Sequence, residues 1–354
     1  MGIGTITQNE LDGFIEACDR HGGVGAPDCA ELLSDFRYQP TKKINENLDP
    51  FSEEYVQEQI ALYSEISGRA LDQQSHEFTG FDLEKCINAK NPYAHSDPTF
   101  IAKHSRTVLQ VIEIAQLPPN PEILDMGCGW GLSTEMMAFC GAEVTCVDIN
   151  LQFLDLVKKR SQKRGHPVRT IHSDFESFET TEKYDMILFY ECFHHAVRPW
   201  VVLERLTDIL KPGGKIILAG EPIQSFWWKQ WGMRLDSQSI YCMHKFGWFE
   251  SGWSLSFLQQ LFAKNNLNVD CRENIGFDGG MICIAQNAEE VKAAKQNSTI
   301  CNTERVHNYL RRWRHSPILA TTPGRFFLKF YTVIKFRVIA LERKIATLIT
   351  AKSK

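Results

Sequence analysis

The sequence lacks any C-x-x-C pair, although it contains eleven cysteines among 354 residues. Their number is odd, and several of them, such as Cys140, Cys146 and Cys283, lie in apolar runs. This distribution argues against a disulfide framework and against a zinc-binding cluster. We therefore expect reduced, buried thiols, a cytoplasmic location and no metal site.

Long hydrophobic segments are also missing. The first residues, Met1 to Thr5, do not have the basic-then-apolar layout of a signal peptide. No uncharged run reaches the roughly 18 residues that a transmembrane helix needs. The sequence contains no internal repeat. We expect a globular protein that does not span a membrane.

The excess charge is small overall but unevenly distributed. The net charge is −4, yet residues 301–354 carry twelve Lys and Arg against two acids. The first 300 residues therefore carry −14. Because the main part of the chain is acidic and the basic residues are confined to the tail, we do not expect nucleic acid as a partner.

The basic tail, residues 288–354, is expected to be helical. Between Arg325 and Leu348, large apolar and basic residues are interleaved. This composition is typical of a helix that lies on a membrane surface or binds a partner protein. A third interpretation is that the helix packs on its own domain with its lysines in solvent. The first of these would make the protein a peripheral membrane protein.

A glycine-rich turn is the most informative stretch. The apolar run from Glu122 to Met126 leads into three glycines at alternate positions, Gly127, Gly129 and Gly131, and then into a helix-forming segment. Such a turn lets the backbone approach a ligand closely and directs helix N–H groups at it. The glycine spacing differs from the nicotinamide-binding fingerprint, because Leu132 occupies the third glycine position.

The chain before this turn is expected to be a helical and irregular extension over residues 1–99, which could act as a lid. Helical periodicity covers Asn9–Cys18 and Phe51–Ile66. Asp97 followed by Pro98 predicts the start of a further helix that ends near Gln116.

Strands and helices alternate after the turn, which predicts an α/β fold with a mostly parallel, Rossmann-like sheet and an antiparallel edge strand. We expect residues 100–287 to form this domain. The predicted strands are Ile123–Met126, Glu143–Asp148, Val168–His172, Tyr184–Tyr190, Lys215–Ala219, Leu267–Arg272 and Met281–Ala285.

Residues 221–253 interrupt the alternation and hold five of the eight tryptophans: Trp227, Trp228, Trp231, Trp248 and Trp253. One interpretation is an aromatic subdomain that needs its own core. The other is a wall over the substrate, because ligands of open α/β sheets bind beyond the carboxyl ends of the strands. This insertion starts at such an end.

Acids stand at four successive strand ends. They are Asp125, Asp148, Asp174 and Glu191, with Phe175 and Tyr190 beside the last two. An acid at the second strand end can accept hydrogen bonds from ribose hydroxyls, and an acid beside an aromatic ring suits adenine. The series predicts an adenosine-containing ligand.

The run from Phe100 to Gln286 resembles the class I S-adenosylmethionine-dependent methyltransferases. The matching motifs are Leu-Asp125-Met-Gly-Cys-Gly-Trp-Gly131, Val-Asp148-Ile-Asn, Ser-Asp174-Phe, Tyr184-Asp-Met-Ile-Leu-Phe-Tyr-Glu-Cys-Phe-His-His195 and Leu210-Lys-Pro-Gly-Gly-Lys215. The resemblance implies a seven-stranded sheet and S-adenosylmethionine as cofactor. It also implies roles for the cofactor-binding residues Asp125, Gly127, Cys128, Gly129, Gly131, Asp148, Ile149, Asp174, Phe175, Tyr190 and Glu191. The glycine loop would contact the methionine part, Asp148 the ribose, Ile149 the adenine face, and Tyr190 and Glu191 the surroundings of the sulfonium.

Methyl transfer to a hydroxyl needs positioning and a base. We expect His195 as the first choice and Glu221 as the second, with His194 and His244 as further candidates. The alternative is that each histidine is structural. Cys192 has no obvious basic partner and is not expected to be a nucleophile.

The acceptor is predicted from the flanking segments. Four segments resemble bacterial methyltransferases associated with polysaccharide biosynthesis: Tyr63–Arg69, Phe81–Tyr93, Trp231–Asp236 and Lys245–Trp248. The resemblance implies a sugar or glycan hydroxyl as acceptor, for which the candidate contacts are Trp227, Trp231, Arg234, Asp236 and His244. The Phe-His-His sequence resembles enzymes that methylate quinone precursors. A third hypothesis is a scaffold that binds the cofactor without catalysis.

Overall fold

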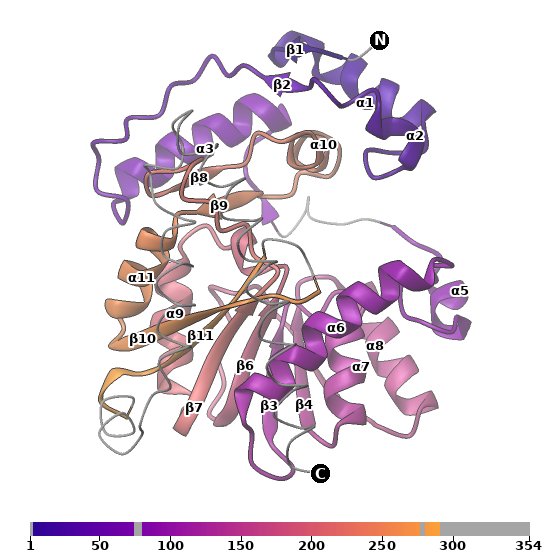
Figure 1. Cartoon of the computed structure of the whole chain (residues 1–354), viewed down its shortest axis with the longest axis vertical. Helices are drawn as coiled ribbons and strands as arrows, with labels where there is room; N and C mark the ends of the chain where they lie inside the picture. Colours follow the sequence, from indigo (N-terminus) through magenta and orange to yellow (C-terminus); the bar gives the residue numbers. More distant parts are fainter. Residues whose placement is uncertain (1–2, 74–79, 277–279, 291–354) are drawn as a thin grey trace, which may run out of the picture.

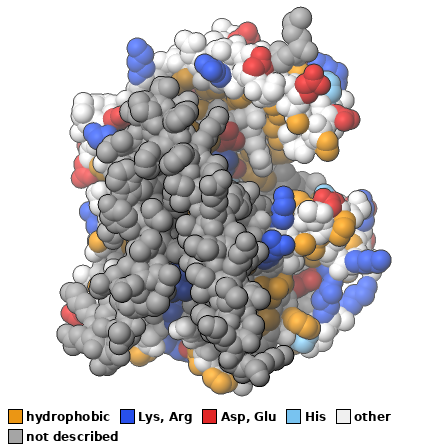
Figure 2. Space-filling view, viewed as in Figure 1, with side chains coloured by type: hydrophobic (Ala, Val, Ile, Leu, Met, Phe, Trp, Pro, Cys, Tyr) orange, Lys and Arg blue, Asp and Glu red, His pale blue; other side chains and the backbone are white. Residues whose placement is uncertain are grey.

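The computed structural model describes residues 3–73, 80–276 and 280–290. Its lower part in Figure 1 is an α/β sandwich, and its upper part is a cap built from the N-terminal region and the insertion. The same face in space-filling form shows an indentation between these two parts at its right-hand edge (Figure 2). The predicted tail helix lies outside the described residues.

A seven-stranded sheet with the order β10-β11-β7-β6-β3-β4-β5 forms the centre of the sandwich. Its strands are β3 (Glu122–Met126), β4 (Glu143–Asp148), β5 (Arg169–His172), β6 (Tyr184–Tyr190), β7 (Leu210–Ala219), β10 (Leu267–Glu273) and β11 (Met281–Asn287). The pairs from β5 to β7 are parallel, and β11 is antiparallel to both of its neighbours. The predicted fold class is confirmed, and the reversed strand, β11, lies one position in from the edge strand β10.

Helices cover both faces of this sheet (Figure 1). One face carries α6 (Pro98–Ala115), α7 (Leu132–Phe139) and α8 (Leu151–Lys163), and the other carries α9 (Pro199–Asp208) and α11 (Leu255–Ala263). Side chains alternate along a strand, so Ile123 packs towards the first set of helices and Leu124 towards the second. Asp97 caps α6 as predicted, since its side chain accepts a hydrogen bond from Thr99 N at 2.8 Å.

A glycine-rich sequence of the kind that usually forms a turn lies inside a strand here. Lys211–Gly214 is part of β7, which begins at Leu210, and the pairing with β6 shifts register between Tyr184 and Met186. Pro-Gly-Gly is the usual composition of a turn. The backbone of Gly214 instead passes so close to Lys211 and Tyr184 that an added Cβ would lie 2.8 Å from Lys211 O.

The N-terminal region forms the outer part of the cap. It contains β1 (Thr5–Ile6) paired with β2 (Arg37–Tyr38), the 3₁₀ turn η1 (Gln8–Glu10), α1 (Leu11–Arg20), α2 (Pro27–Ala30) and α3 (Glu53–Ser67). A short helix, α5 (Leu83–Asn88), follows at the side of α8. The two helices predicted before residue 67 are present as α1 and α3.

The insertion forms the inner part of the cap. It consists of an antiparallel pair, β8 (Trp231–Met233) with β9 (Ser251–Trp253), and α10 (Ser237–Phe246) between them. Helix α3 lies against this unit: Tyr55 Oη donates to Trp231 O at 2.6 Å, and Tyr63 Oη donates to Gly247 O at 2.7 Å. One continuous apolar core joins α3, the insertion and the α9–α11 face of the sheet. The N-terminal region is therefore packed into the fold rather than hinged beside it.

Within the described residues, no helix combines the length and the apolar character needed to cross a membrane.

Candidate active site

A cavity of about 1060 Å³ lies at the carboxyl ends of the parallel strands, beneath the cap. Many of the predicted residues line it: Gly127, Cys128, Gly129, Asp148, Ile149, Asp174, Phe175, Tyr190, Glu191, His194, His195 and Arg234. Seven others do not belong to its wall: Asp125, Gly131, Glu221, Trp227, Trp231, Asp236 and His244. The volume exceeds what most single small ligands fill, so a cofactor and an acceptor can share it.

The glycine loop is shaped by close packing as well as by backbone angles. Gly127, Gly129 and Gly131 all have positive φ, between +49° and +83°. A Cβ on Gly127 would lie 2.9 Å from Cys192 Sγ, and one on Gly131 would lie 2.5 Å from Val157 Cγ2. Gly131 therefore lets the loop pack on α8 and does not face the cavity, which is a correction to its assignment as a ligand contact.

Asp125 also acts from beneath the loop. Its side chain is fully buried, and its Oδ2 accepts hydrogen bonds from Ser133 Oγ at 2.8 Å and Thr134 Oγ1 at 2.6 Å. Burial raises the pKa of this carboxyl to about 6. Asp125 thus joins the end of β3 to the first turn of α7, and it positions the loop without lining the cavity.

Asp148, at the end of β4, does line the cavity. Its Oδ2 accepts from Gly129 N at 2.8 Å, and its Oδ1 accepts from Asn150 N at 2.8 Å. These bonds, with a weaker one from Cys128 Sγ at 3.9 Å, fix the carboxylate against the glycine loop, and Asp148 keeps accepting capacity on the cavity side. Burial raises its pKa to about 6. The geometry suits a ribose diol, which presents two hydroxyl donors.

The next two strand ends complete a compartment for a flat ring. Ile149 follows Asp148, and Phe175 follows Asp174 after β5; all four line the cavity. Phe175 is held by an edge-on contact with Phe189, with ring centroids 5.3 Å apart. Asp174 Oδ1 accepts a hydrogen bond from Ser177 N at 2.7 Å, which orders the loop that carries it.

Tyr190 and Glu191 form the centre of the cavity wall. Tyr190 Oη lies 2.6 Å from His104 Nδ1, and Glu191 Oε2 lies 3.6 Å from the same nitrogen. Glu191 has φ +55°, a left-handed conformation that is uncommon outside glycine. Burial, reinforced by the nearby Glu221, raises the pKa of Glu191 to about 7.

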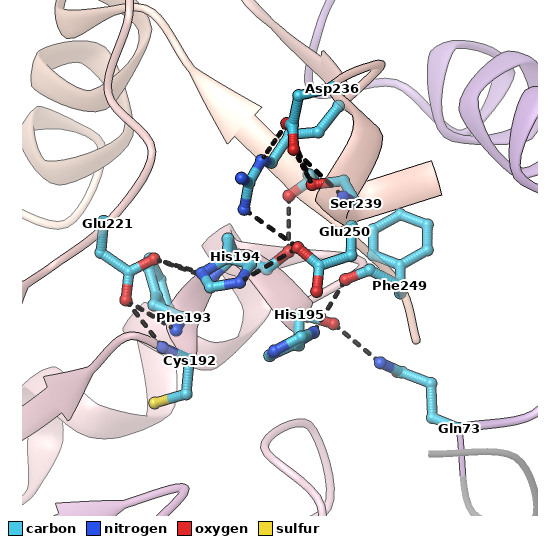
Figure 3. A network of polar contacts seen from close by, with 12 residues as sticks. Gln73, Cys192, Phe193, His194, His195, Glu221, Asp236, Ser239, Phe249 and Glu250 are labelled. Atoms are coloured by element: carbon cyan, nitrogen blue, oxygen red, sulfur yellow. Dashed lines mark hydrogen bonds and ion pairs between the residues drawn. The ribbon is translucent and has the colours of Figure 1, made fainter. Parts of the chain in front are cut away.

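Glu221 organises the turn η2 (Phe193–His195) from behind the cavity wall (Figure 3). Its carboxylate accepts hydrogen bonds from the backbone N–H groups of Cys192, Phe193 and His194 at 2.9–3.1 Å. It also lies 2.8 Å from His194 Nδ1. A carboxylate with four such contacts is not free to act as a base, so the structure corrects that second choice: Glu221 is a positioning residue.

His194 lies between two carboxylates. Its Nδ1 contacts Glu221, and its Nε2 lies 3.5 Å from Glu250 Oε2. Burial acts to lower the pKa of His194, but the two carboxylates outweigh it and raise the pKa to about 9. Burial acts in the opposite sense on Glu250, where His194 and Arg234 outweigh it and hold the pKa near 2. Ion pairing therefore outweighs burial in setting the pKa values of His194 and Glu250.

His195 has the opposite character. Its Nδ1 donates to Phe249 O at 2.9 Å, and because a carbonyl can only accept, the ring proton is on Nδ1. The lone pair is then on Nε2, and His195 lines the cavity. Burial, together with the neighbouring His194, lowers the pKa of His195 to about 4, so this imidazole is neutral at pH 7.

The predicted substrate residues do not all reach the cavity. Arg234 lines the cavity and binds Glu250 Oε2 at 3.0 Å and Asp236 Oδ2 at 3.0 Å. Asp236 caps α10 through Ser239 N, and His244 contacts Ile66 O and Asp12. Both are used within the cap and stand outside the cavity wall.

The tryptophans of the insertion divide in the same way. Trp231 is 1% exposed and donates from Nε1 to Pro50 O at 2.8 Å, so it belongs to the core. Trp227 is 54% exposed and outside the cavity wall. Trp248, which the sequence did not single out as a ligand contact, lines the cavity edge-on to His195 with centroids 5.9 Å apart.

Several cavity residues were missed from the sequence because they come from distant segments. Tyr93 and Phe100, with His104, reach the cavity from the chain before and within α6, and Trp130 and Phe153 stand beside them. The Asn91-Pro-Tyr93 sequence in a polar loop was the available signal for the first of these. Glu250 had no signal, since nothing in its neighbourhood distinguishes it from a solvated acid.

Comparisons with known proteins place the central part of the chain. Residues 124–218 match the family described as "Methyltransferase domain". A ubiquinone biosynthesis O-methyltransferase from Proteus mirabilis is 32% identical over 100 residues, which are 28% of this chain and 41% of that protein. The enzyme of that name from Actinobacillus pleuropneumoniae is 32% identical over 104 residues, 28% of this chain and 44% of the relative. The chain thus spans less than half the length of these two relatives.

Solved structures resemble this chain at a lower sequence identity than these relatives. Magnesium protoporphyrin IX methyltransferase from Synechocystis PCC 6803 with bound S-adenosylmethionine is 18% identical, and the match covers 61% of this chain and 97% of that one with a TM-score of 0.43. The sequence match, and not this likeness, assigns the domain. Residues 124–218 match a methyltransferase domain, in agreement with the methyltransferase motifs that the sequence shows in this part of the chain.

Proposed function

We propose that the protein transfers a methyl group from S-adenosylmethionine to a hydroxyl of a small acceptor. One observation carries this proposal: a single cavity holds Asp148, Asp174 and Glu191 at successive strand ends together with the neutral imidazole of His195. The acids match an adenosine and a sulfonium, and the imidazole is available to an acceptor oxygen.

In the proposed reaction the acceptor oxygen attacks the methyl carbon in line with the carbon–sulfur bond. The new carbon–oxygen bond forms as the old bond breaks, and sulfur keeps the electron pair and becomes a neutral thioether. The acceptor hydroxyl gives up its proton, directly or through the cavity wall, to water. The chain contributes mainly orientation, exclusion of water and activation of the hydroxyl. We assign activation to the corner of the cavity that presents His195 Nε2.

For the acceptor, we favour a phenolic, quinone-type ring over the sugar hydroxyl that the flanking segments suggested. Of the five residues on which the sugar hypothesis relied, Arg234 lines the cavity. The other four stand outside its wall: Trp227, Trp231, Asp236 and His244. The wall instead presents Ile60, Leu71, Phe100 and Trp248, which suit an apolar ring. The two relatives named above, by their printed names, act in ubiquinone biosynthesis.

The test is a turnover assay with S-adenosylmethionine and two acceptor sets, catechols and sugar glycosides, with the product identified by mass spectrometry. We expect methylated catechol, and a 10²–10⁴-fold lower kcat in His195→Ala at unchanged affinity for S-adenosylhomocysteine. The exposed His166 serves as control through His166→Ala. Binding of S-adenosylhomocysteine without turnover of either set would favour the non-catalytic scaffold. The proposed membrane or protein contact of the tail remains a prediction.

A further inference from the structure

The corner of the cavity that holds His195 contains more than a base. One nitrogen or carboxylate oxygen from each of His194, His195 and Glu250 lies within 4.8 Å of those from the other two. The three residues come from two separate elements, η2 and the chain just before β9, and their side chains converge in Figure 3. Two histidines and one glutamate are the protein ligands of a common class of catalytic zinc site, which keeps a fourth position open.

Both imidazoles are oriented as metal ligands usually are. A ligating histidine donates its other ring N–H to a carboxylate or a backbone carbonyl. Here His194 Nδ1 contacts Glu221 at 2.8 Å and His195 Nδ1 donates to Phe249 O at 2.9 Å. These contacts leave the two Nε2 atoms as the candidate ligands. The third candidate ligand is the carboxylate of Glu250, whose Oε2 also accepts a hydrogen bond from Arg234 at 3.0 Å.

The spacing is also informative. His194 Nε2 and Glu250 Oε2 are 3.5 Å apart, longer than the roughly 2.7–2.9 Å of a charge-assisted hydrogen bond. Metal–ligand bonds of about 2.0–2.2 Å place two ligand atoms of a tetrahedral ion roughly 3.3 Å apart. The separation of these two atoms is therefore close to that of two ligands on one ion, and a ligand atom of His195 lies within 4.8 Å of the other two residues of the cluster.

The formal charges favour a cation as well. Glu221, Glu250 and Asp236 surround the two imidazoles, and Arg234 is the one guanidinium in contact with this group among the described residues. Once an ion has displaced the Nε2 proton of His194 and both imidazoles are neutral, the three carboxylates and Arg234 leave the cluster with a formal charge of −2. A divalent ion would balance this charge.

We propose that His194, His195 and Glu250 bind a divalent transition-metal ion of the zinc type, whose open position takes the acceptor oxygen. This inference rests on the proposed function and deepens it by defining how the acceptor is activated. A coordinated hydroxyl loses its proton to water more readily, because the ion stabilises the resulting oxyanion. His195 then acts as a ligand in the loaded protein. An acceptor with two adjacent oxygens would gain most, since both can reach the ion.

The test uses the full-length chain after treatment with EDTA and gel filtration. Cobalt(II) chloride is titrated in while the visible absorption of a histidine–carboxylate complex is followed, and zinc chloride is titrated in a calorimeter. We expect one equivalent to bind at micromolar concentration. Glu250→Gln and His195→Gln should each weaken binding at least tenfold. Glu221→Gln, which disturbs the turn that presents both histidines without removing a candidate ligand, should weaken it by about 10–100-fold.

The matched control is His21→Gln. This imidazole also contacts a backbone carbonyl, Ala17 O at 2.8 Å, but it is exposed on the cap. Affinity for S-adenosylhomocysteine reports whether each variant is folded. If Glu250→Gln does not fold, His195→Gln decides.

Three outcomes would overturn the ion site. The first is no saturable change in absorption up to millimolar cobalt, and the second is wild-type affinity for cobalt in both Glu250→Gln and His195→Gln. The third is full turnover in EDTA by a protein that does not bind cobalt. The last would leave the proposed methyl transfer intact. Cobalt binding that depends on Glu250, without turnover of any acceptor, would support the ion site and count against the proposed function.

Discussion

Glu221 Oε2 and His194 Nδ1 lie 2.8 Å apart and join the end of β7 to the turn that follows β6. The same carboxylate receives three backbone N–H groups of that turn. It therefore holds, as one unit, the segment that presents both histidines to the cavity.

Replacement of Glu221 by glutamine tests this positioning role. A glutamine has one acceptor oxygen, so its amide NH₂ would face donors that now have an acceptor. We expect Glu221→Gln to lower the free energy of unfolding by about 1–3 kcal/mol, the usual effect of an unsatisfied buried hydrogen bond. Urea denaturation measures it. Glu204→Gln, on the exposed side of α9, is the control, and an equal effect of the two substitutions would contradict the assignment.

Removal of the Asp148 carboxylate tests the ribose site. Hydrogen bonds to a charged group contribute about 1.5–3 kcal/mol. We therefore expect Asp148→Ala to weaken binding of S-adenosylhomocysteine roughly 10–100-fold in a calorimeter. Asp155→Ala removes an acid that pairs with Lys159 on the surface of α8, and it should leave the affinity unchanged. Wild-type affinity in Asp148→Ala would rule out our ribose assignment.

The titration of Glu191 should make the relative affinities for S-adenosylmethionine and S-adenosylhomocysteine depend on pH. Its pKa of about 7 means that it is neutral at pH 6 and largely ionised at pH 8. Only the ionised form attracts the sulfonium of S-adenosylmethionine, whereas S-adenosylhomocysteine has no such charge. We expect the ratio of the two affinities to shift towards S-adenosylmethionine as the pH rises from 6 to 8, in calorimetry with EDTA present.

The matched variant is Glu191→Gln, which cannot ionise. It should show the same ratio at both pH values. A pH-dependent ratio that persists in this variant would assign the effect to another group.

Two tryptophans of the insertion, the buried Trp231 and the exposed Trp227, should contribute differently to the stability of the fold. Trp231 is packed between Tyr55, Trp200 and Phe257. We expect Trp231→Ala to cost about 3–5 kcal/mol of unfolding free energy, as for other buried large-to-small changes. Trp227→Ala should change it by no more than about 0.5 kcal/mol. Thermal and urea unfolding of the two variants side by side would show the contrast, and comparable losses would contradict it.

The sheet could be predicted from the sequence because its signals are local. Each strand is a short apolar run, and the acids Asp148, Asp174 and Glu191 follow strand ends that meet at one edge of a parallel sheet. Their convergence on one cavity follows from topology alone. The motif residues that failed to reach the cavity, Asp125 and Gly131, face inwards, and a sequence does not show which side of a loop is packed.

The cap could not be predicted in the same way. Glu250 meets His194 only because β9 returns beside β8 and η2, and no local pattern encodes that path. The tryptophan-rich composition was compatible both with a core and with a ligand wall, and the structure uses it for both, in Trp231 and Trp248. Roles that depend on contacts between distant segments were therefore the ones the sequence left open.

The packing of α3 against the insertion also bears on how the chain is made. Tyr55 and Trp231 are 176 positions apart, and Tyr63 and Gly247 are 184 apart. During synthesis, the apolar face of α3 must wait for well over a hundred further residues before its partners emerge. Contacts of such separation slow folding and leave apolar surface open to misassembly in the meantime. We therefore expect the docking of α3 on the insertion to come late in the folding of the chain.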